Sequence, residues 1–317
     1  MTVALFYLAK PRTGGWPTFT AHLALGLGDA QIFRVTRRSE KSQRPFGRGL
    51  GYQNVDLESA LAIAQTFPSI ITATDKHYAE VASPLAPLCA TVVHDPTELK
   101  LPHLAHLGTT IVIRQTMCEY LPGATFIRHP YQRDATLKPL PPKSGAVAIS
   151  RVDFDKRTRM ICEANDLGAA IHIHGTENPI YTHFDLDEKV PGWRDWYRGP
   201  FPVDDLWAGA KICADAKAMV DLSVISGDGG GSQYTFLEAL DAGAALVLHR
   251  EWKPVGPLAE IACTVDTPRD LVDAVDGAVP PGSEADALLE AHDAVAIASR
   301  FRELAASLPV KCRSGGA

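Results

Sequence analysis

The segment GAVAISRVDFDKRTRMICEAND (residues 145–166) has the pattern of a strand, a turn and an amphipathic helix. Its apolar residues first follow one another without interruption and then recur at helical spacing. Arg151 and Lys156 stand where the strand would end and the helix begin. Unpaired main-chain N–H groups at a helix start, together with two fixed cations, attract a diphosphate. A strand end with two exposed cations is the alternative interpretation.

A glycine-rich loop follows in GDGGGSQYTFLEALDAGAALVLHR (residues 227–250). Its closely spaced glycines allow the main chain to approach a phosphate. Ser232, Gln233 and Thr235 add hydrogen-bonding side chains, and a helix that contains Glu238 is expected next. A glycine cluster alone is often only a turn, but two such loops in one half of the chain predict a nucleotide-phosphate site.

These two segments resemble the donor domain of GT-B glycosyltransferases of the retaining, Glu-x7-Glu type. The resemblance implies that Arg151 and Lys156 bind the donor diphosphate, and that Glu238 binds the nucleotide ribose. It further implies a UDP-sugar as co-substrate, with no bound cofactor and no metal. The donor-binding candidates are Gly15, Arg151, Lys156, Gly230, Gly231, Ser232, Gln233, Tyr234, Thr235 and Glu238.

The chain departs from the Glu-x7-Glu motif at its first position. That position is Gly230, and the nearest acid is Asp228. Asp228 is therefore a catalytic candidate that would contact the sugar hydroxyls. The missing glutamate also leaves open a protein that binds nucleotide sugars without catalysing a reaction.

Apolar runs alternate with helix-like segments along most of the chain. Continuous apolar runs indicate strands of a parallel sheet that is covered on both faces, so the predicted fold class is α/β. The expected strands lie in VALFYLA, AQIFRV, SIITAT, ATVVHD, TTIVIRQ, ATFIRHP, GAVAIS, AAIHIHG, AMVDLSVIS, AALVLHR and ACTVD.

Residues 136–145 contain three prolines, which do not fit a sheet interior, and this segment predicts a domain linker. We expect an acceptor-binding Rossmann-like domain over residues 1–140 and a donor-binding Rossmann-like domain over residues 141–285. The GT-B resemblance implies that the two domains face each other across a cleft. A C-terminal helix and tail, residues 286–317, are expected near the domain junction.

The composition is that of an ordinary globular protein, with 46% hydrophobic and 21% charged residues in a chain of 317. No apolar run approaches the about 18 residues that span a bilayer, so no membrane partner is expected. The six cysteines form no CxxC pair, which argues against a disulfide framework or a zinc ribbon. We expect a cytoplasmic protein, in the host cytoplasm if it is viral.

The loop after the first expected strand reads AKPRTGGWPTFT (residues 9–20). Gly14 and Gly15 let the main chain approach a ligand, and Trp16 offers a flat apolar surface for an acceptor. A plain turn with a buried Trp fits the same letters.

In VVHDPTELK (residues 92–100), His94 and Asp95 follow another expected strand. An imidazole beside a carboxylate can accept the proton of an acceptor hydroxyl, so both residues are catalytic candidates. Alternatively, Asp95 caps a helix that has Pro96 at its first position.

The motif HIH (residues 172–174), with Glu177 and His183 nearby, invites a metal-site interpretation. The same letters fit a sheet strand with both imidazoles on one face. We favour this structural role.

The segment RVTRRSEKSQRPFGR (residues 34–48) concentrates six cations and one acid in a chain whose net charge is −6. Phe46 within it and Tyr52 just after it can stack on bases, so the stretch predicts contacts with a phosphate backbone. This resembles the DNA glycosyltransferases of bacteriophages, which glycosylate hydroxymethylated pyrimidines, and it makes DNA the expected acceptor. A solvated loop, and a lipid or saccharide acceptor, remain alternatives. The acceptor-binding candidates are Trp16, Arg37, Arg38, Lys41, Arg44 and Arg48.

Overall fold

The structure is a computed structural model that describes residues 2–11, 13–36, 47–95, 98, 108–137, 143–224 and 231–308. The chain forms two compact units. Unit 1 comprises residues 1–132, 204–206 and 292–317, and unit 2 comprises residues 133–203 and 207–291. The described part of the proline-containing segment therefore belongs to unit 2, and the C-terminal helix returns to unit 1.

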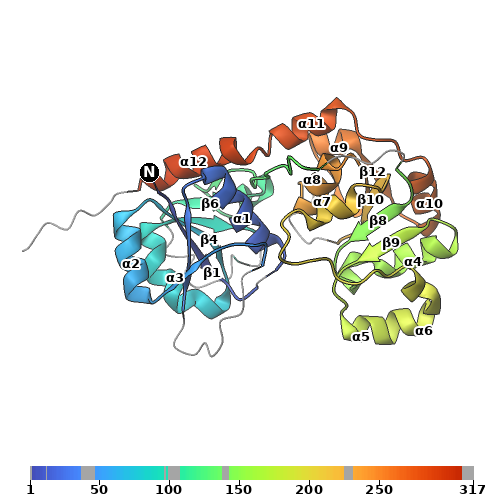
Figure 1. The fold of residues 1–317 in the computed structure, drawn as a ribbon, viewed down its shortest axis with the longest axis horizontal. Helices are drawn as coiled ribbons and strands as arrows, with labels where there is room; N and C mark the ends of the chain where they lie inside the picture. Colours follow the sequence, from blue (N-terminus) through green and yellow to red (C-terminus); the bar gives the residue numbers. More distant parts are fainter. Residues whose placement is uncertain are drawn as a thin grey trace, which may run out of the picture. The chain divides into compact units, whose positions relative to one another are not determined.

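Within the described ranges, the sheet of unit 1 has seven parallel strands in the order β3-β2-β1-β4-β5-β6-β7. They are β1 (Ala4–Leu8), β2 (Gln31–Val35), β3 (Gln53–Val55), β4 (Ser69–Thr74), β5 (Ala90–Val93), β6 (Thr110–Val112) and β7 (Thr125–Phe126). Helices α2 (Leu57–Thr66) and α3 (Ala79–Leu85) pack on one face, and α1 (Gly15–Leu27) and α12 (Ala294–Ala306) pack together on the other (Figure 1). Short 3₁₀ helices are Lys76–Tyr78, Ala86–Leu88 and Gln115–Glu119.

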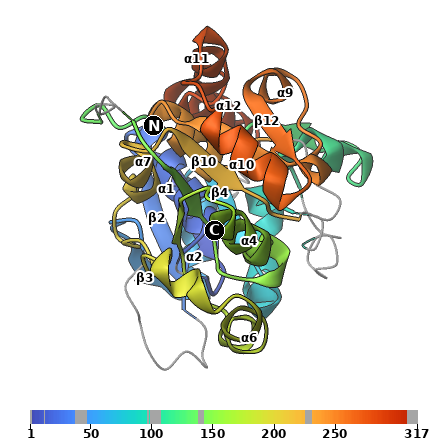
Figure 2. The ribbon, with the colours of Figure 1, turned by 90° about the vertical axis from the view of Figure 1, so that its right-hand side faces the viewer.

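The sheet of unit 2 has five parallel strands in its described part, in the order β12-β11-β10-β8-β9. They are β8 (Ala146–Ile149), β9 (Ile171–His174), β10 (Ala218–Asp221), β11 (Ala245–His249) and β12 (Ala262–Val265). Helices α4 (Thr158–Asp166) and α10 (Pro268–Asp276) lie side by side over one main core (Figure 2). The other helices are α5 (Pro179–Tyr181), α6 (Asp187–Lys189), α7 (Ala208–Cys213), α8 (Tyr234–Asp241), α9 (Pro257–Ile261) and α11 (Ser283–Glu290), with 3₁₀ helices Phe154–Lys156, Pro191–Asp195 and Arg250–Trp252 and a π-helical turn Thr182–Leu186.

Every apolar run that was expected to be a strand contains one, and all strand pairings are parallel, which confirms the α/β prediction. The reason is burial: β1, β4 and β8 are buried along their whole length. The prediction missed β3, which is short and has two exposed residues, so it carries no apolar run. No helix in the described part of the chain combines the length and the apolar character of a membrane span.

Where a single C-terminal helix was expected from residue 286, the described part of the chain has two helices, α11 and α12. The helical pattern breaks between them, where Asp293 pairs with Tyr131 as an isolated bridge and its side chain accepts from Ala296 N at 2.8 Å. The start of α12 then packs tightly on α1. A Cβ added at Gly26 would lie 2.2 Å from the Ala294 carbonyl oxygen, so this crossing needs the glycine.

Candidate functional site

The loop after β8 carries the two cations that the sequence placed there. Arg151 is exposed, and its guanidinium lies 3.4 Å from Asp153 Oδ2 and 3.2 Å from Asp155 Oδ2. Lys156 ends the 3₁₀ turn, and its Nζ lies 3.6 Å from Asp155. The strand, turn and helix of the prediction are confirmed by β8, this turn and α4.

The loop after β10 holds Lys156 from the neighbouring strand. Lys156 Nζ donates to Ser223 Oγ at 3.0 Å, and the Ser223 hydroxyl donates to the buried carboxylate of Asp221. A main-chain hydrogen bond also joins the two loops, since Val224 N donates to the Asp155 carbonyl oxygen at 2.7 Å. The carboxyl ends of two adjacent parallel strands thus form one cationic edge, which is where ligands bind in sheets of this kind.

Helix α8 begins with its main-chain donors uncapped by a side chain. Just before it, the Gly231 carbonyl accepts from the indole of the buried Trp252 at 3.1 Å, which fixes the entry of the chain into the helix. Thr235 lies in the first turn, and its hydroxyl oxygen is buried without a hydrogen-bond partner among the described residues. An uncapped helix start and an unpaired hydroxyl suit an anion. Asp228 and Gly230 lie outside the described residues, whereas Ser232 and Gln233 are described and half-buried.

Glu238 lies one turn further along α8 and is only 5% exposed. Its carboxylate lies against Gly209 of α7: a Cβ added at Gly209 would be 2.2 Å from Glu238 Oε2. Burial, together with the nearby charge of Glu238, raises the pKa of Tyr234 well above its usual range. The role of Glu238 in ribose binding stays a prediction.

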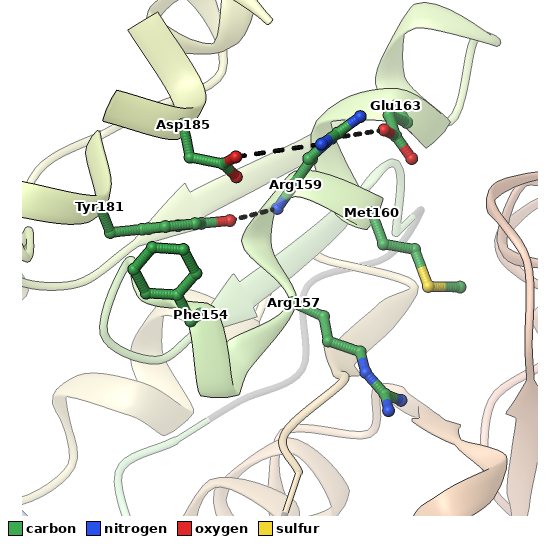
Figure 3. Close-up of a pocket in the computed structure, with 7 residues that line it drawn as sticks. All are labelled: Phe154, Arg157, Arg159, Met160, Glu163, Tyr181 and Asp185. Carbon is green, nitrogen blue, oxygen red and sulfur yellow. Dashed lines mark hydrogen bonds and ion pairs between the residues drawn. The ribbon is translucent and has the colours of Figure 1, made fainter. Parts of the chain in front are cut away.

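A surface pocket of about 330 Å³ is lined by residues of the turn after β8, of α4 and of the segment around Tyr181 (Figure 3). The exposed ring of Phe154 packs on the ring of Tyr181, and the two ring centroids are 4.3 Å apart. The Tyr181 hydroxyl accepts a hydrogen bond from Arg159 N at 2.9 Å. The Arg159 guanidinium pairs with Glu163, while Arg157 points away from the two aromatic rings (Figure 3). These contacts fasten the loop that carries Arg151 and Lys156 to α4 and to the segment around Tyr181.

In unit 1, His94 lies directly after β5 and is 6% exposed. Its Nε2 is 2.7 Å from the Thr72 carbonyl; because a carbonyl only accepts, Nε2 carries the hydrogen and Nδ1 the lone pair. Burial lowers the pKa of His94 to about 4, so the ring is neutral near pH 7. The Trp16 ring lies 6.0 Å from it and Phe19 packs edge-on at 4.8 Å. A neutral imidazole of this kind can accept a proton.

Glu98 lies behind His94 and was not predicted from the sequence. It is 3% exposed, and its Oε2 accepts from His94 N at 3.2 Å. Burial and the neighbouring charge of Asp95 raise the pKa of Glu98 well above its usual range. The hydrophilic letters around position 98 gave no signal of this burial, because it depends on the packing of distant segments.

The loop before α1 is described except at residue 12. Gly14 has a φ of 97°, which favours glycine, and Gly15 begins α1 with open space where a Cβ would lie. Trp16 is half-buried and packs with Tyr7, Ala73 and their neighbours. The contacts of Gly15 and Trp16 with ligands stay predictions.

The basic stretch differs from the expected exposed patch in its described part. Arg34 is 2% exposed and donates to the Tyr78 hydroxyl at 3.2 Å. Arg48 is 8% exposed; it donates to Thr18 Oγ1 at 3.0 Å and to the Asp205 carbonyl at 3.1 Å. Both cations therefore stabilise unit 1, and Arg48 is corrected from a surface contact to a buried one. Arg37, Arg38, Lys41, Arg44 and Phe46 lie outside the described residues.

The HIH motif forms β9 with both imidazoles half-buried on one face, as expected for a strand. Burial lowers the pKa values of His172 and His174, and the His172 ring lies 5.9 Å from Trp196. Among the residues that the structure describes, no three His, Cys, Asp or Glu side chains gather as a metal ion would require.

The fold has counterparts among solved structures. HepE of Anabaena, in complex with UDP and glucose, is 12% identical and has a TM-score of 0.69 over 97% of this chain and 100% of that chain. AviGT4, a glycosyltransferase involved in avilamycin A biosynthesis, is 17% identical, with a TM-score of 0.61 over 97% of this chain and 98% of that chain. The chain has the GT-B fold.

A third structure with this fold is an alpha-glucosyltransferase in complex with UDP and a 13-mer DNA containing a central A:G mismatch. It is 13% identical, with a TM-score of 0.60 over 97% of this chain and 91% of that chain. No protein-family profile matches the chain, and neither does any curated protein. At these identities the likeness concerns the GT-B fold.

Proposed function

We propose that this protein is a glycosyltransferase that moves a sugar from a UDP-sugar to an acceptor hydroxyl. The observation that carries the proposal is the edge formed by Arg151, by Lys156 with its 3.0 Å contact to Ser223, and by the uncapped start of α8. Fixed cations and free main-chain donors stabilise the diphosphate as it gains charge and leaves. HepE and the alpha-glucosyltransferase were both solved with UDP, which supports uridine diphosphate as the leaving group.

In this proposal, the acceptor oxygen forms a bond to the anomeric carbon of the sugar while the bond from that carbon to the phosphate oxygen breaks. UDP leaves with the bonding electrons, and Arg151 and Lys156 balance its charge. The proton of the acceptor hydroxyl passes to His94 Nδ1, whose lone pair is set by the Nε2 contact with Thr72. We assign Asp95 to the acceptor side with His94.

Release of UDP in the presence of acceptor tests the enzyme. The purified protein is incubated with UDP-glucose and other UDP-sugars, and UDP is measured with and without acceptor. We expect acceptor-dependent release that is lost in Lys156→Ala. Tight UDP binding without release under any acceptor would instead indicate a non-catalytic nucleotide-sugar-binding protein.

For the acceptor we propose a 5-hydroxymethylpyrimidine in DNA. An alpha-glucosyltransferase with the same fold was solved with UDP and a 13-mer DNA containing an HMU base, at 14% identity. The chain also places Arg37, Arg38, Lys41 and Arg44 between β2 and β3. Cations that neutralise phosphates release counterions, so affinity would fall with salt by a log–log slope of about −0.9 per phosphate.

A triple variant tests this acceptor. Replacing Arg37, Arg38 and Lys41 by Ala should reduce the size of the salt slope by about two to three and raise the KM for hydroxymethylated DNA. UDP affinity should not change. Glycosylation of a saccharide or lipid, with hydroxymethylated DNA left unmodified at low salt, would contradict the DNA proposal and leave the glycosyltransferase proposal intact.

A further inference from the structure

Gly209 is the second residue of α7 and is buried. A Cβ at this position would lie 2.2 Å from Glu238 Oε2, 2.7 Å from Cδ and 3.1 Å from Oε1. Non-bonded carbon atoms prefer separations of about 3.5 to 4.0 Å, so a side chain at position 209 and the present carboxylate would compete for one space. The whole carboxylate of Glu238 is thus seated on the bare main chain of α7.

The residues around Gly209 make this glycine conspicuous. Ala208 and Ala210 flank it, and both are buried in the same helix. Glycine is a weaker helix former than alanine, and Gly209 has no positive φ that would require a glycine. Alanine would suit α7 better, and the carboxylate of Glu238 is what excludes it.

We infer that Gly209 is a positioning residue of the donor site, which sets the depth of the Glu238 carboxylate and through it the recognition of the nucleotide ribose. The inference rests on the proposed function, in which Glu238 binds the ribose hydroxyls. A carboxylate accepts hydrogen bonds from a diol only within a narrow range of distances, so a displacement comparable to a methyl group loses them.

Gly209→Ala should move the carboxylate rather than unfold the unit, because the atoms in the way are the end of a flexible side chain. We expect UDP to bind about tenfold more weakly in Gly209→Ala, from the loss of a charge-assisted hydrogen bond. Binding of 2′-deoxy-UDP, which lacks one ribose hydroxyl, should change less. The affinity for UDP divided by the affinity for 2′-deoxy-UDP, both measured by calorimetry, should therefore be smaller in Gly209→Ala than in the parent.

Two further variants make the test specific. Gly192→Ala is the matched control in unit 2, since a Cβ there meets no atom within 4 Å and Gly192 has no positive φ; it should bind UDP like the parent. In a Glu238→Ala background, Gly209→Ala should have no further effect on UDP affinity, because the group it displaces is gone. This background also shows whether α7 accepts the alanine and folds.

The outcomes separate the two proposals. Unchanged UDP affinity and an unchanged ratio in Gly209→Ala, with a parent that binds UDP, would overturn the role of Gly209 alone. An equal loss of affinity in the Glu238→Ala background would also overturn it, since the effect would then act through α7. A folded parent that binds no UDP would overturn the proposed function and this inference together.

Discussion

The carboxyl edges of the two sheets differ in how far their candidate side chains are exposed to solvent. In unit 1, His94 at this edge is 6% exposed. Burial lowers its pKa to about 4, so the ring is neutral near pH 7. In unit 2, Arg151 is exposed at this edge, and Lys156 contacts Ser223 and Asp155. Burial disfavours the charged form of the His94 ring. In the proposed reaction this neutral ring takes the proton of the acceptor, and the two cations of unit 2 balance the charge of UDP. The comparison is thus between a buried imidazole at the edge of one sheet and an exposed guanidinium at the edge of the other.

The largest effect that tests this contrast is expected at His94. His94→Gln keeps a donor for the Thr72 carbonyl but has no basic lone pair, so kcat should fall by about 10²- to 10⁴-fold. UDP affinity, measured by calorimetry, should stay at the parent value because the substitution is in unit 1. A variant that retains parental kcat would remove His94 from the reaction.

Lys156 should give the next largest effect, and UDP affinity is the quantity that isolates its contact with the diphosphate. Lys156→Ala should weaken UDP binding by about 10- to 100-fold, as expected for a charge-assisted contact. Lys189→Ala is the control, because Lys189 is also in unit 2 and pairs with Asp185 instead of Asp155 or Ser223. Equal UDP affinities in both variants would show that the cationic edge does not bind the diphosphate.

Acid should weaken unit 1 through its buried histidines. Burial lowers the pKa of His22 from 6.5 to about 3, and burial also lowers the pKa values of His129 and His292. The unfolded chain gains protons as the pH falls through 6.5 while these folded rings stay neutral, so stability is complete above pH 6.5 and is lost below it. The free energy of unfolding is measured by urea unfolding at pH 7.5 and 5.5. Its decrease with falling pH should be smaller in His22→Asn than in the parent, by up to about 1.4 kcal/mol per pH unit. Parallel pH curves for the variant and the parent would contradict the assignment.

The smallest effect is expected at Thr235, and it has opposite signs for stability and binding. Thr235→Val removes a buried hydroxyl that has no partner in the described structure, so the free protein should gain up to about 1 kcal/mol in unfolding free energy. UDP binding should weaken a few-fold. Thr158→Val is the control, since the Thr158 hydroxyl contacts the Asp153 main chain and its removal should destabilise. Unchanged UDP affinity in Thr235→Val would exclude the hydroxyl from the donor site.

The amino-acid sequence by itself determined the local elements. Uninterrupted apolar runs specify buried parallel strands, because a strand covered on both faces has no polar side to show. The same local logic put Arg151 and Lys156 at the end of β8, where the structure has them. It missed β3, which is too short and too exposed to leave a pattern.

The tertiary structure alone decided which polar side chains are buried and against what. Arg48 looked like part of an exposed basic stretch, yet Thr18 and Asp205, far away in the sequence, enclose it. The seating of Glu238 on Gly209 likewise joins two helices whose letters show no relation. Burial is a sum over contacts between distant segments, and a charge or a glycine carries no sign of it in its own neighbourhood. The sequence therefore determined which elements form, while the fold determined which of their side chains lose water, and with it which remain charged.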